Sequence, residues 1–449
     1  MRRTLAELAA RCGGAVRGDA ATVVTGAAID SRALRPGALF VALPGERVDG
    51  HEFVPDAAGN GAAAALVSRV VDFPIAQIVV RDTLAALQAI AAGERAGSSY
   101  RLAGVTGSVG KTTTKEFLAA LLATTFAVGA TQGSRNSQAG FPVELCNQGD
   151  DLAWMVAELG MSHAGELDRL GALARPDALV YTVIAPVHIE YFSGIDAIAA
   201  AKAELIPHLS RDGVLVLNLA DARVAALADR FPGRVLGYGL PHRSDLWIEG
   251  YASRGLRGSS FRLRGAGRSI AVDWALAGRH QADNLLAAAC LALALGVPEE
   301  RIAPCAATLA PARRRGEVHT LAGGITVVDD SYNASPDAVM RLLDLLAETS
   351  GRKLAVLGEM LELGEGSVAY HREVGARAGA VCDLVVTVGG EPAVALARAA
   401  HAVSHHVSDA AAAARLVPTL LRPGDVVLVK GSRGIGLDRV VDALLAGRS

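Results

Sequence analysis

Short apolar runs alternate with longer stretches of mixed apolar and polar residues through the middle of the chain. The runs are rich in Val, Leu and Ile, and they cover Leu102 to Thr106, Leu152 to Glu158, Ala178 to Ile184 and Gly213 to Leu217. Strands separated by helical stretches are typical of a parallel sheet with crossover helices. We therefore predict an α/β region that ends with a helix over Arg279 to Leu295.

The neighbouring segments have patterns of their own. Alternating residues with many Gly and Arg between Val235 and Trp274 predict β-hairpins. Near the start of the chain, short β-type runs cover Leu39 to Leu43, Ala63 to Val67 and Gln77 to Val80. Near its end, further runs alternate with helices and predict a second, Rossmann-like sheet. These runs cover Ile325 to Asp329, Lys353 to Gly358, Leu384 to Val388 and Val426 to Lys430.

Chain length and one small polar segment predict the domain boundaries. A chain of 449 residues is too long for a single hydrophobic core, so about three domains are expected. Gly97 to Tyr100, with the sequence Gly-Ser-Ser-Tyr, reads as a linker. We predict domains over residues 1–98, 99–313 and 314–449.

Charge and cysteine usage exclude several classes of protein. The 44 basic and 46 acidic residues nearly balance, so no electrostatic attraction to nucleic acid or membranes is implied. The five cysteines form no Cys-x-x-Cys pair and fit buried thiols in a reducing compartment. The longest apolar run, Leu285 to Val297, is too short to span a bilayer. We expect a cytoplasmic protein that neither binds nucleic acid nor inserts into a membrane.

The stretch from Val105 to Thr114 carries the clearest chemistry. It places a glycine-rich turn between a predicted strand and a helix that runs from Lys111 to about Thr125. In such a turn, successive N–H groups point inward, and the helix N-terminus adds partial positive charge. Lys111 would reach the outer phosphates of a nucleotide, and the Thr112 hydroxyl would ligate Mg²⁺. The candidate triphosphate-binding residues are Gly107, Ser108, Val109, Gly110, Lys111, Thr112 and Thr113.

The glycine spacing departs from the strict phosphate-loop pattern. Val105 stands where that pattern has its first glycine, and the glycines here are Gly104, Gly107 and Gly110. A glycine-rich turn that binds nothing is the alternative interpretation. The loop alone also does not specify the reaction.

Three residues after the loop are candidates for metal binding. Glu158 ends a predicted strand, and His188 follows the next one, so both are expected at the sheet edge that carries the loop. A solvated glutamate and a structural histidine are the alternatives. Lys202 lies among alanines, and its physical chemistry alone favours a lysine that reaches solvent. A carbamate formed with CO₂ is its other interpretation.

Taken together, these segments resemble the Mur ligases, and within that family the type that adds D-alanyl-D-alanine. The resemblance covers essentially the whole chain. Val105 to Thr112 resembles the ATP loop of the family, and Ala157 to Met161 resembles its metal-carboxylate segment. His188, with Lys202 fourteen residues later, resembles the histidine and carbamylated lysine of the second metal site. The most type-specific stretch is Asp329-Asp-Ser-Tyr-Asn-Ala-Ser-Pro336.

The resemblance implies a three-domain Mur ligase architecture with ATP and two Mg²⁺ ions as cofactors. The implied catalytic residues are Lys111, His188 and Lys202, with Lys202 carbamylated. Thr112, Glu158, His188 and Lys202 would hold the metal ions. Further contacts to ATP are implied for Asn284, Arg315 and Asp330.

The same resemblance implies the substrates, UDP-MurNAc-tripeptide and D-alanyl-D-alanine. Asp30-Ser-Arg32 and Gly45 to His51 resemble the uridine-nucleotide domain. One departure is Gly133-Ser-Arg-Asn-Ser137, which keeps Asn136 but lacks two amides of the family pattern. The implied substrate-binding residues are Ser31, Arg32, His51, Asn136, Asn333, Ser432 and Arg433.

The expected activity is ATP-driven amide formation through an acyl phosphate, carried out by a monomer during peptidoglycan precursor synthesis. Two alternatives remain open at this point. One is a sister ligase that adds a single amino acid, either diaminopimelate or lysine. The other is a phosphate-loop ATPase without ligase chemistry, which would have no use for His188 and Lys202.

Overall fold

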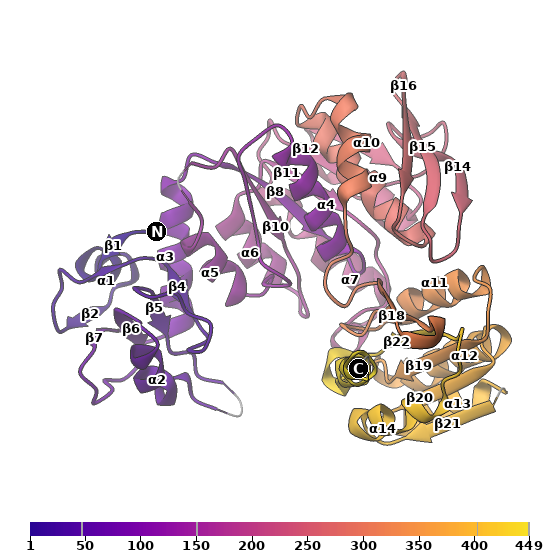
Figure 1. The fold of residues 1–449 in the computed structure, drawn as a ribbon. Coiled ribbons are helices and arrows are strands. Elements are labelled where there is room, and N and C mark those ends of the chain that lie inside the picture. Colours follow the sequence, from indigo (N-terminus) through magenta and orange to yellow (C-terminus); the bar gives the residue numbers. More distant parts are fainter. Residues whose placement is uncertain (46–47, 150, 402, 448–449) are drawn as a thin grey trace. The chain divides into compact units, whose positions relative to one another are not determined.

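The computed structural model describes residues 1–45, 48–149, 151–401 and 403–447 (Figure 1). Glu46 and Arg47, within the Gly45 to His51 segment, lie outside the described residues. The chain groups into two compact units. The first comprises Met1–Val105, Phe126–Leu179 and Lys202–Gly213, and the second comprises Thr106–Thr125, Val180–Ala201 and Val214–Ser449. Strands alternate with helices in both, so the predicted α/β class is confirmed.

The first part of the chain forms a five-stranded sheet in the order β2-β7-β6-β5-β4. Its parallel strands are short and almost wholly buried, which explains their apolar sequences. The three predicted strands are present with ends shifted by one or two residues. The elements are β2 (Ala15–Arg17), β4 (Ala27–Ala28), β5 (Leu39–Val41), α2 (Val54–Gly59), β6 (Ala64–Val67), β7 (Ala76–Val79) and α3 (Thr83–Gly97).

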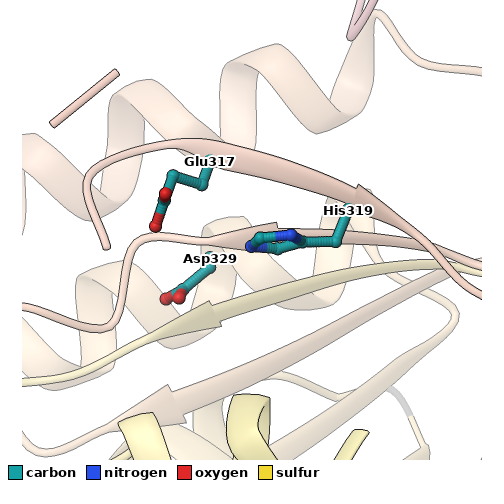
Figure 2. A group of neighbouring side chains, drawn as sticks. All are labelled: Glu317, His319 and Asp329. Atoms are coloured by element: carbon teal, nitrogen blue, oxygen red, sulfur yellow. The ribbon is translucent and has the colours of Figure 1, made fainter. Parts of the chain in front are cut away.

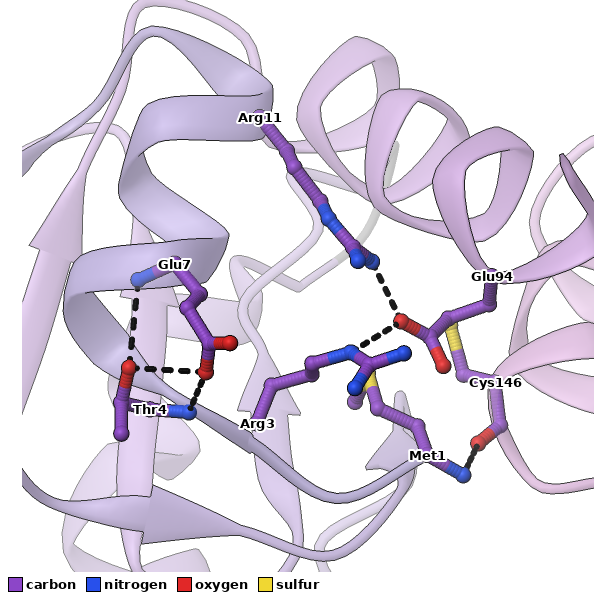
Figure 3. A network of polar contacts seen from close by, with 7 residues as sticks. All are labelled: Met1, Arg3, Thr4, Glu7, Arg11, Glu94 and Cys146. Atoms are coloured by element: carbon purple, nitrogen blue, oxygen red, sulfur yellow. Dashed lines mark hydrogen bonds and ion pairs between the residues drawn. The ribbon is translucent and has the colours of Figure 1, made fainter. Parts of the chain in front are cut away.

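Helix α1 (Leu5–Cys12) begins with a reciprocal cap (Figure 3). The Glu7 carboxylate accepts hydrogen bonds from the Thr4 backbone N–H at 2.7 Å and from its hydroxyl at 2.9 Å. In return, the Thr4 Oγ1 accepts from the Glu7 backbone N–H. Two N–H groups at the helix start are thereby satisfied, as in a capping box. Thr4 also pairs with Val23 across the two-stranded sheet of β1 (Arg3–Thr4) and β3 (Val23–Val24).

Glu94 of α3 joins this N-terminal segment to the rest of the first unit (Figure 3). Its Oε1 accepts from Arg3 Nε at 2.9 Å and also from Arg11. The amino group of Met1 donates to the carbonyl oxygen of Cys146 at 2.9 Å. These contacts link α1, α3 and α5 (Gly140–Cys146) inside one unit.

The central sheet has the order β13-β12-β11-β8-β10-β9. Its strands are β8 (Arg101–Thr106), β9 (Val128–Ala130), β10 (Trp154–Glu158), β11 (Ala178–Tyr181), β12 (Val214–Asn218) and β13 (Arg234–Tyr238). The four predicted strands are confirmed. One prediction is wrong in part: β13 pairs in parallel with β12 instead of forming a hairpin. The predicted hairpins are β14 (Trp247–Ser253), β15 (Ser259–Gly265) and β16 (Arg268–Trp274).

The helices of this region follow the predicted crossovers. α4 begins at Lys111 as predicted and packs against α9, whose end falls one residue before the predicted one. The rings of Phe117 in α4 and Trp274 in β16 pack edge to face, with their centroids 5.8 Å apart. This contact joins the hairpins to α4. The helices are α4 (Lys111–Ala123), α6 (Glu166–Ala174), α7 (Ile195–Ala203), α8 (Ala222–Ala225), α9 (Arg279–Ala294) and α10 (Glu299–Thr308).

The last part of the chain is a six-stranded sheet in the order β17-β18-β22-β19-β20-β21. Buried Val and Leu residues on its two faces form separate hydrophobic clusters under the helices. All four predicted strands are present, and β17 and β21 were not predicted. The elements are β17 (Glu317–Thr320), β18 (Thr326–Asp329), α11 (Pro336–Ala347), β19 (Lys353–Gly358), α12 (Ser367–Val381), β20 (Leu384–Val388), α13 (Glu391–Ala399), β21 (Val403–Val407), α14 (Ala410–Leu420), β22 (Val426–Lys430) and α15 (Asp438–Ala446).

Among the described residues, no helix combines the length and apolar character that crossing a bilayer requires.

Candidate active site

The glycine-rich loop turns where β8 ends, and two of its glycines cannot be replaced without strain. Gly107 has a φ of +140°, and a Cβ there would lie 1.9 Å from the hydroxyl oxygen of Thr182. Gly110 has a φ of +85°, and its Cβ would lie 2.4 Å from Oδ1 of Asn284. L-residues other than glycine rarely adopt such backbone angles. The loop is therefore tightly wound against two polar side chains.

Lys111 closes the loop on itself. Its Nζ donates to the carbonyl oxygens of Gly107 at 2.9 Å and Ser108 at 3.0 Å. The Ser108 hydroxyl donates to the carbonyl oxygen of Ala185 at 2.9 Å. The ammonium group is thus held at the start of α4, where the helix dipole and N–H groups favour an anion.

The threonines that follow the lysine are buried in the first turn of α4. The exposed fractions of Thr112 and Thr113 are 4% and 5%. Asn284 of α9 accepts from the Thr114 hydroxyl at 3.4 Å. Thr182 donates to the carbonyl oxygen of Val109 at 2.6 Å, so it fixes the loop from the opposite flank to Asn284. The sequence alone assigned no role to Thr182.

Glu158 ends β10 and is 2% exposed. Its Oε1 accepts a hydrogen bond from Asn136 Nδ2 at 2.6 Å. The backbone supports both residues: Glu158 N–H donates to the Thr131 hydroxyl at 3.1 Å, and Gly160 N–H donates to the Asn136 carbonyl oxygen at 3.2 Å. A buried, oriented carboxylate is a suitable ligand for a hard cation such as Mg²⁺.

His188 and Lys202 both occupy constrained positions. His188 has a left-handed φ of +59°, and its Nδ1 forms an ion-pair contact with Glu362. Glu190 N–H donates to the Glu362 carbonyl oxygen at 3.4 Å, so this segment meets the loop after β19. Lys202, near the end of α7, is 3% exposed. The expectation of a lysine that reaches solvent is therefore wrong for Lys202, which is buried.

Two predicted arginines meet at Tyr332. The guanidinium carbon of Arg315 lies 4.2 Å from the centroid of the Tyr332 ring, and that of Arg433 lies 5.3 Å from it. Arg433 Nη1 also donates to the Tyr332 hydroxyl at 3.0 Å. Tyr332 was part of the Asp329 to Pro336 motif, but no role had been assigned to it.

The remaining predicted residues of this sheet edge are bound to one another. Lys430 Nζ pairs with Asp330 and donates to the carbonyl oxygen of Asn333 at 2.9 Å. The Ser432 hydroxyl accepts from the Leu361 N–H at 2.9 Å. The ends of β18 and β22 are therefore held together at the residues implicated by the family resemblance.

The uridine-side residues lie in the first unit. Arg32 pairs with Asp30 at 2.9 Å, and its side chain is 86% exposed. The Ser31 carbonyl oxygen accepts from the Asn60 amide at 3.0 Å. His51 is 2% exposed, with Nδ1 at 2.6 Å from Asp49 and Nε2 accepting from Ser68 N–H at 2.8 Å. Both ring nitrogens of His51 are thus used within the domain. The hydrogen bonds from His51 and Arg69 lower the pKa of Asp49.

A group that sequence reasoning missed lies on β17 and β18. The ligand atoms of Glu317, His319 and Asp329 lie within 4.8 Å of one another (Figure 2). Burial raises the pKa of Asp329, although hydrogen bonds from Ser331 oppose that change. Glu317 accepts from the Arg314 N–H at 2.6 Å. The carboxylates therefore already serve the local turns, and the alternation of Glu317 and His319 on one strand was the available signal.

The structure places the predicted residues in two groups. Within the second unit, Lys111 and Asn284 each contact the loop, and Arg315 and Arg433 share Tyr332. Within the first unit, Asn136 is bound to Glu158. Each group, taken within its own unit, thus lies near strand ends, which is where α/β sheets bind ligands.

Three family models match the chain. They are the Mur ligase middle domain over residues 105–292, the Mur ligase glutamate ligase domain over 314–433, and the Mur ligase family catalytic domain over 23–95. A UDP-N-acetylmuramoyl-tripeptide–D-alanyl-D-alanine ligase from Mycobacterium tuberculosis strain H37Rv is 36% identical, covering 99% of this chain and 98% of that protein. The ligase of that name from Bacillus subtilis is 34% identical, with 94% of each chain covered.

Solved structures of MurF ligases also match nearly the whole chain. A crystal structure of MurF from Acinetobacter baumannii matches with a TM-score of 0.89 and 29% identity, covering 99% of each chain. The MurF ligase from Thermotoga maritima in complex with ADP matches with a TM-score of 0.81 and 29% identity, covering 95% of this chain and 99% of that one. A diaminopimelate ligase matches with a TM-score of 0.55 and 20% identity, which shows the fold alone.

Proposed function

Because the chain belongs to the Mur ligase family and is an ATP-dependent ligase that adds D-alanyl-D-alanine to UDP-N-acetylmuramoyl-tripeptide, we propose which residues perform each part of that reaction. It has the three-domain architecture of the family, uses ATP and Mg²⁺, and acts in peptidoglycan synthesis. The relatives that match its full length favour this activity over single-amino-acid addition or ATP hydrolysis alone.

The proposed domains are residues 1–98 for the uridine nucleotide, 99–313 for ATP and 314–449 for the incoming dipeptide. The extents of the three family models, at 23–95, 105–292 and 314–433, support these boundaries. Ser31 and Arg32 would contact the uridine-linked substrate. Because both ring nitrogens of His51 are bonded within the domain, His51 would support the uridine site by fixing the positions of Asp49 and Ser68.

The chemistry requires an activated carboxylate, because a free carboxylate has a poor leaving group. An oxygen of the tripeptide carboxylate attacks the γ-phosphorus of ATP, the bond to the bridging oxygen breaks, and ADP leaves. The amine nitrogen of D-alanyl-D-alanine then attacks the acyl carbon, loses a proton and expels phosphate. Closing water out of the site would protect the acyl phosphate.

Phosphoryl transfer depends mainly on alignment and on neutralised charge. Lys111 would exchange its two bonds to loop carbonyl oxygens for bonds to phosphate oxygens. The N–H groups from Gly107 to Thr113 would surround the phosphates. Asn284, Arg315 and Asp330 would contact the nucleotide, and Asn136, Asn333, Ser432 and Arg433 would contact the peptide substrates.

The Thr112 hydroxyl, the Glu158 carboxylate and a Lys202 carbamate would offer the oxygen atoms that Mg²⁺ prefers, and His188 would add a nitrogen. Thr112 and Glu158 are both buried, and Glu158 is already oriented by Asn136. We assign one ion to this pair and a second to His188 and a carbamate on Lys202. When bound, the ions held by these residues would neutralise negative charge on the phosphate oxygens during phosphoryl transfer.

Burial supports the carbamate on Lys202. Lys202 is only 3% exposed, so its side chain ends inside the protein, where it could serve a bound metal ion, and not in solvent. The neutral amine can attack CO₂ and lose a proton, which converts a cationic side chain into an anionic metal ligand. We further propose that the enzyme works as a cytoplasmic monomer. Free cysteines throughout the described chain support a reducing compartment.

The buried, oriented carboxylate of Glu158 carries this assignment, and metal counting tests it. We expect two Mn²⁺ ions per chain to bind in the presence of a non-hydrolysable ATP analogue and UDP-N-acetylmuramoyl-tripeptide. Glu158→Gln should lose one ion, and Glu166→Gln, a partly exposed glutamate on the following helix, should lose none. An unchanged count in Glu158→Gln would refute the assignment.

A further inference from the structure

We propose that Tyr332 is a positioning residue that fixes Arg315 and Arg433 as a pair of anion-binding groups, Arg315 for nucleotide phosphate and Arg433 for the carboxylate of the incoming dipeptide. This inference rests on the contacts proposed above, those of Arg315 to the nucleotide and of Arg433 to the peptide substrates. It adds that one aromatic ring couples them.

The contacts to the ring are of two kinds. The guanidinium carbon of Arg315 lies 4.2 Å from the ring centroid, a distance typical of cation–π contact. Arg433 lies farther from the centroid, at 5.3 Å, and its Nη1 donates to the Tyr332 hydroxyl at 3.0 Å. Removing the hydroxyl would therefore affect Arg433 directly, and removing the ring would affect both arginines.

The backbone around Tyr332 is held by two other segments of the chain. Tyr332 N–H donates to the carbonyl oxygen of Arg314 at 3.2 Å, which ties the backbone of Tyr332 to the turn before β17. Lys430, at the end of β22, donates to the next residue's carbonyl oxygen, that of Asn333, at 2.9 Å. A tyrosine on a backbone anchored in this way can hold the two arginines in one geometry.

The charge of the two arginines is left uncompensated. In the described part of the chain, neither Arg315 nor Arg433 forms an ion pair with a carboxylate. The neighbouring Arg314 differs, because it pairs with Asp438 and with Asp442 at 3.2 Å. An aromatic ring orients a guanidinium group without neutralising it. Arg315 and Arg433 are therefore built to receive an anion, whereas Arg314 serves the fold.

Steady-state kinetics of Tyr332→Phe and Tyr332→Leu test the inference. Phe keeps the ring and loses the hydroxyl, so we expect the KM for D-alanyl-D-alanine to rise about five-fold with the KM for ATP unchanged. Leu should raise both KM values by about five-fold or more. Tyr370→Phe, on a helix of the same sheet, should change neither value.

A double-mutant cycle separates this inference from the roles of the arginines. In an Arg433→Ala background, Tyr332→Phe should have no further effect on the KM for D-alanyl-D-alanine. If Arg315→Ala and Arg433→Ala leave both KM values unchanged, the proposed roles of the arginines fail. If those variants raise KM but Tyr332→Phe and Tyr332→Leu do not, at equal thermal stability, the positioning role of Tyr332 fails.

Discussion

Asn136 donates from Nδ2 to Oε1 of Glu158 over 2.6 Å, at the end of a strand where the carboxylate is 2% exposed. Hydrogen bonds to an ionised carboxylate are short and strong. This bond fixes one oxygen of the carboxylate and so determines how Glu158 presents itself to a cation. Asn136 is also the amide that remains in a segment where the family pattern has more.

Asn136→Ala should weaken metal binding more than it weakens the fold. Without the amide, the Glu158 carboxylate loses a hydrogen bond that orients it, and loss of such an outer partner typically costs about 10–100-fold in metal affinity. We expect the Mg²⁺ concentration at half-maximal activity to rise by about that factor. Gln132→Ala, an exposed side chain in the same segment, is the control and should leave it unchanged. An Asn136→Ala enzyme with normal Mg²⁺ dependence would argue against this role.

Gly107→Ala should abolish ATP binding. The new Cβ would lie 1.9 Å from Thr182 Oγ1, and the φ of +140° is itself unfavourable for alanine. The loop would have to open and lose the geometry of its N–H groups. Gly250→Ala is a matched control, because its φ is +63° but its Cβ would have no neighbour within 4 Å. Calorimetric titration with ADP measures the effect, and binding by Gly107→Ala within two-fold of the parent would contradict the prediction.

Lys202→Ala should lose most activity, on the order of 100-fold or more, since an anionic ligand to the second ion is removed. Short carboxylic acids should restore part of the rate by occupying the space of the carbamate. With ¹³C-bicarbonate, the parent enzyme should show a carbamate carbon signal that Lys202→Gln lacks. Full activity of the unrescued variant would end the carbamate assignment.

Two histidines, the buried His371 and the half-buried His280, should make the enzyme less stable in acid. Burial lowers the pKa of His280 to about 4 and also lowers that of His371. His371 accepts from Met360 N–H at Nε2 and faces the Ser367 carbonyl oxygen at Nδ1, so its neutral form fits the fold. At a pH between the lowered pKa of each histidine in the folded protein and the pKa of about 6.5 in the unfolded chain, the unfolded chain binds more protons than the native one.

The free energy of unfolding should therefore fall as pH decreases from about 6.5 toward 4. The His280 contribution is at most roughly 3 kcal/mol. Urea unfolding at pH 7 and pH 5 measures it, and His280→Gln should show a smaller difference between the two pH values than the parent. His163→Gln, an exposed histidine, should behave as the parent does. Equal pH dependence in parent and His280→Gln would contradict the assignment.

Strands and the phosphate loop could be predicted because their signals are local. The buried parallel strands are continuous apolar runs, and Lys111 after Gly110 marks a helix start, so β19, β20 and β22 matched to the residue. β17 was missed because Glu317 to Thr320 is short and polar, as suits an antiparallel edge strand. β13 was taken for a hairpin because its composition matches that of the hairpins that follow it.

The contacts that orient the site could not be predicted, because they join residues far apart in sequence. Tyr332 and Arg433 are 101 residues apart, and Asn284 and Thr114 are 170 apart. Family resemblance supplied Arg315 and Arg433, whereas only the fold shows that Tyr332 lies beside both. The burial of Lys202 likewise depends on packing that a lysine among alanines does not reveal.

Phosphate release from ATP, measured with and without each co-substrate, tests the central claim most directly. We expect release only when UDP-N-acetylmuramoyl-tripeptide and D-alanyl-D-alanine are both present, with one pentapeptide product per phosphate by mass spectrometry. Release that is indifferent to both substrates, with no pentapeptide formed, would contradict it and leave only an ATPase.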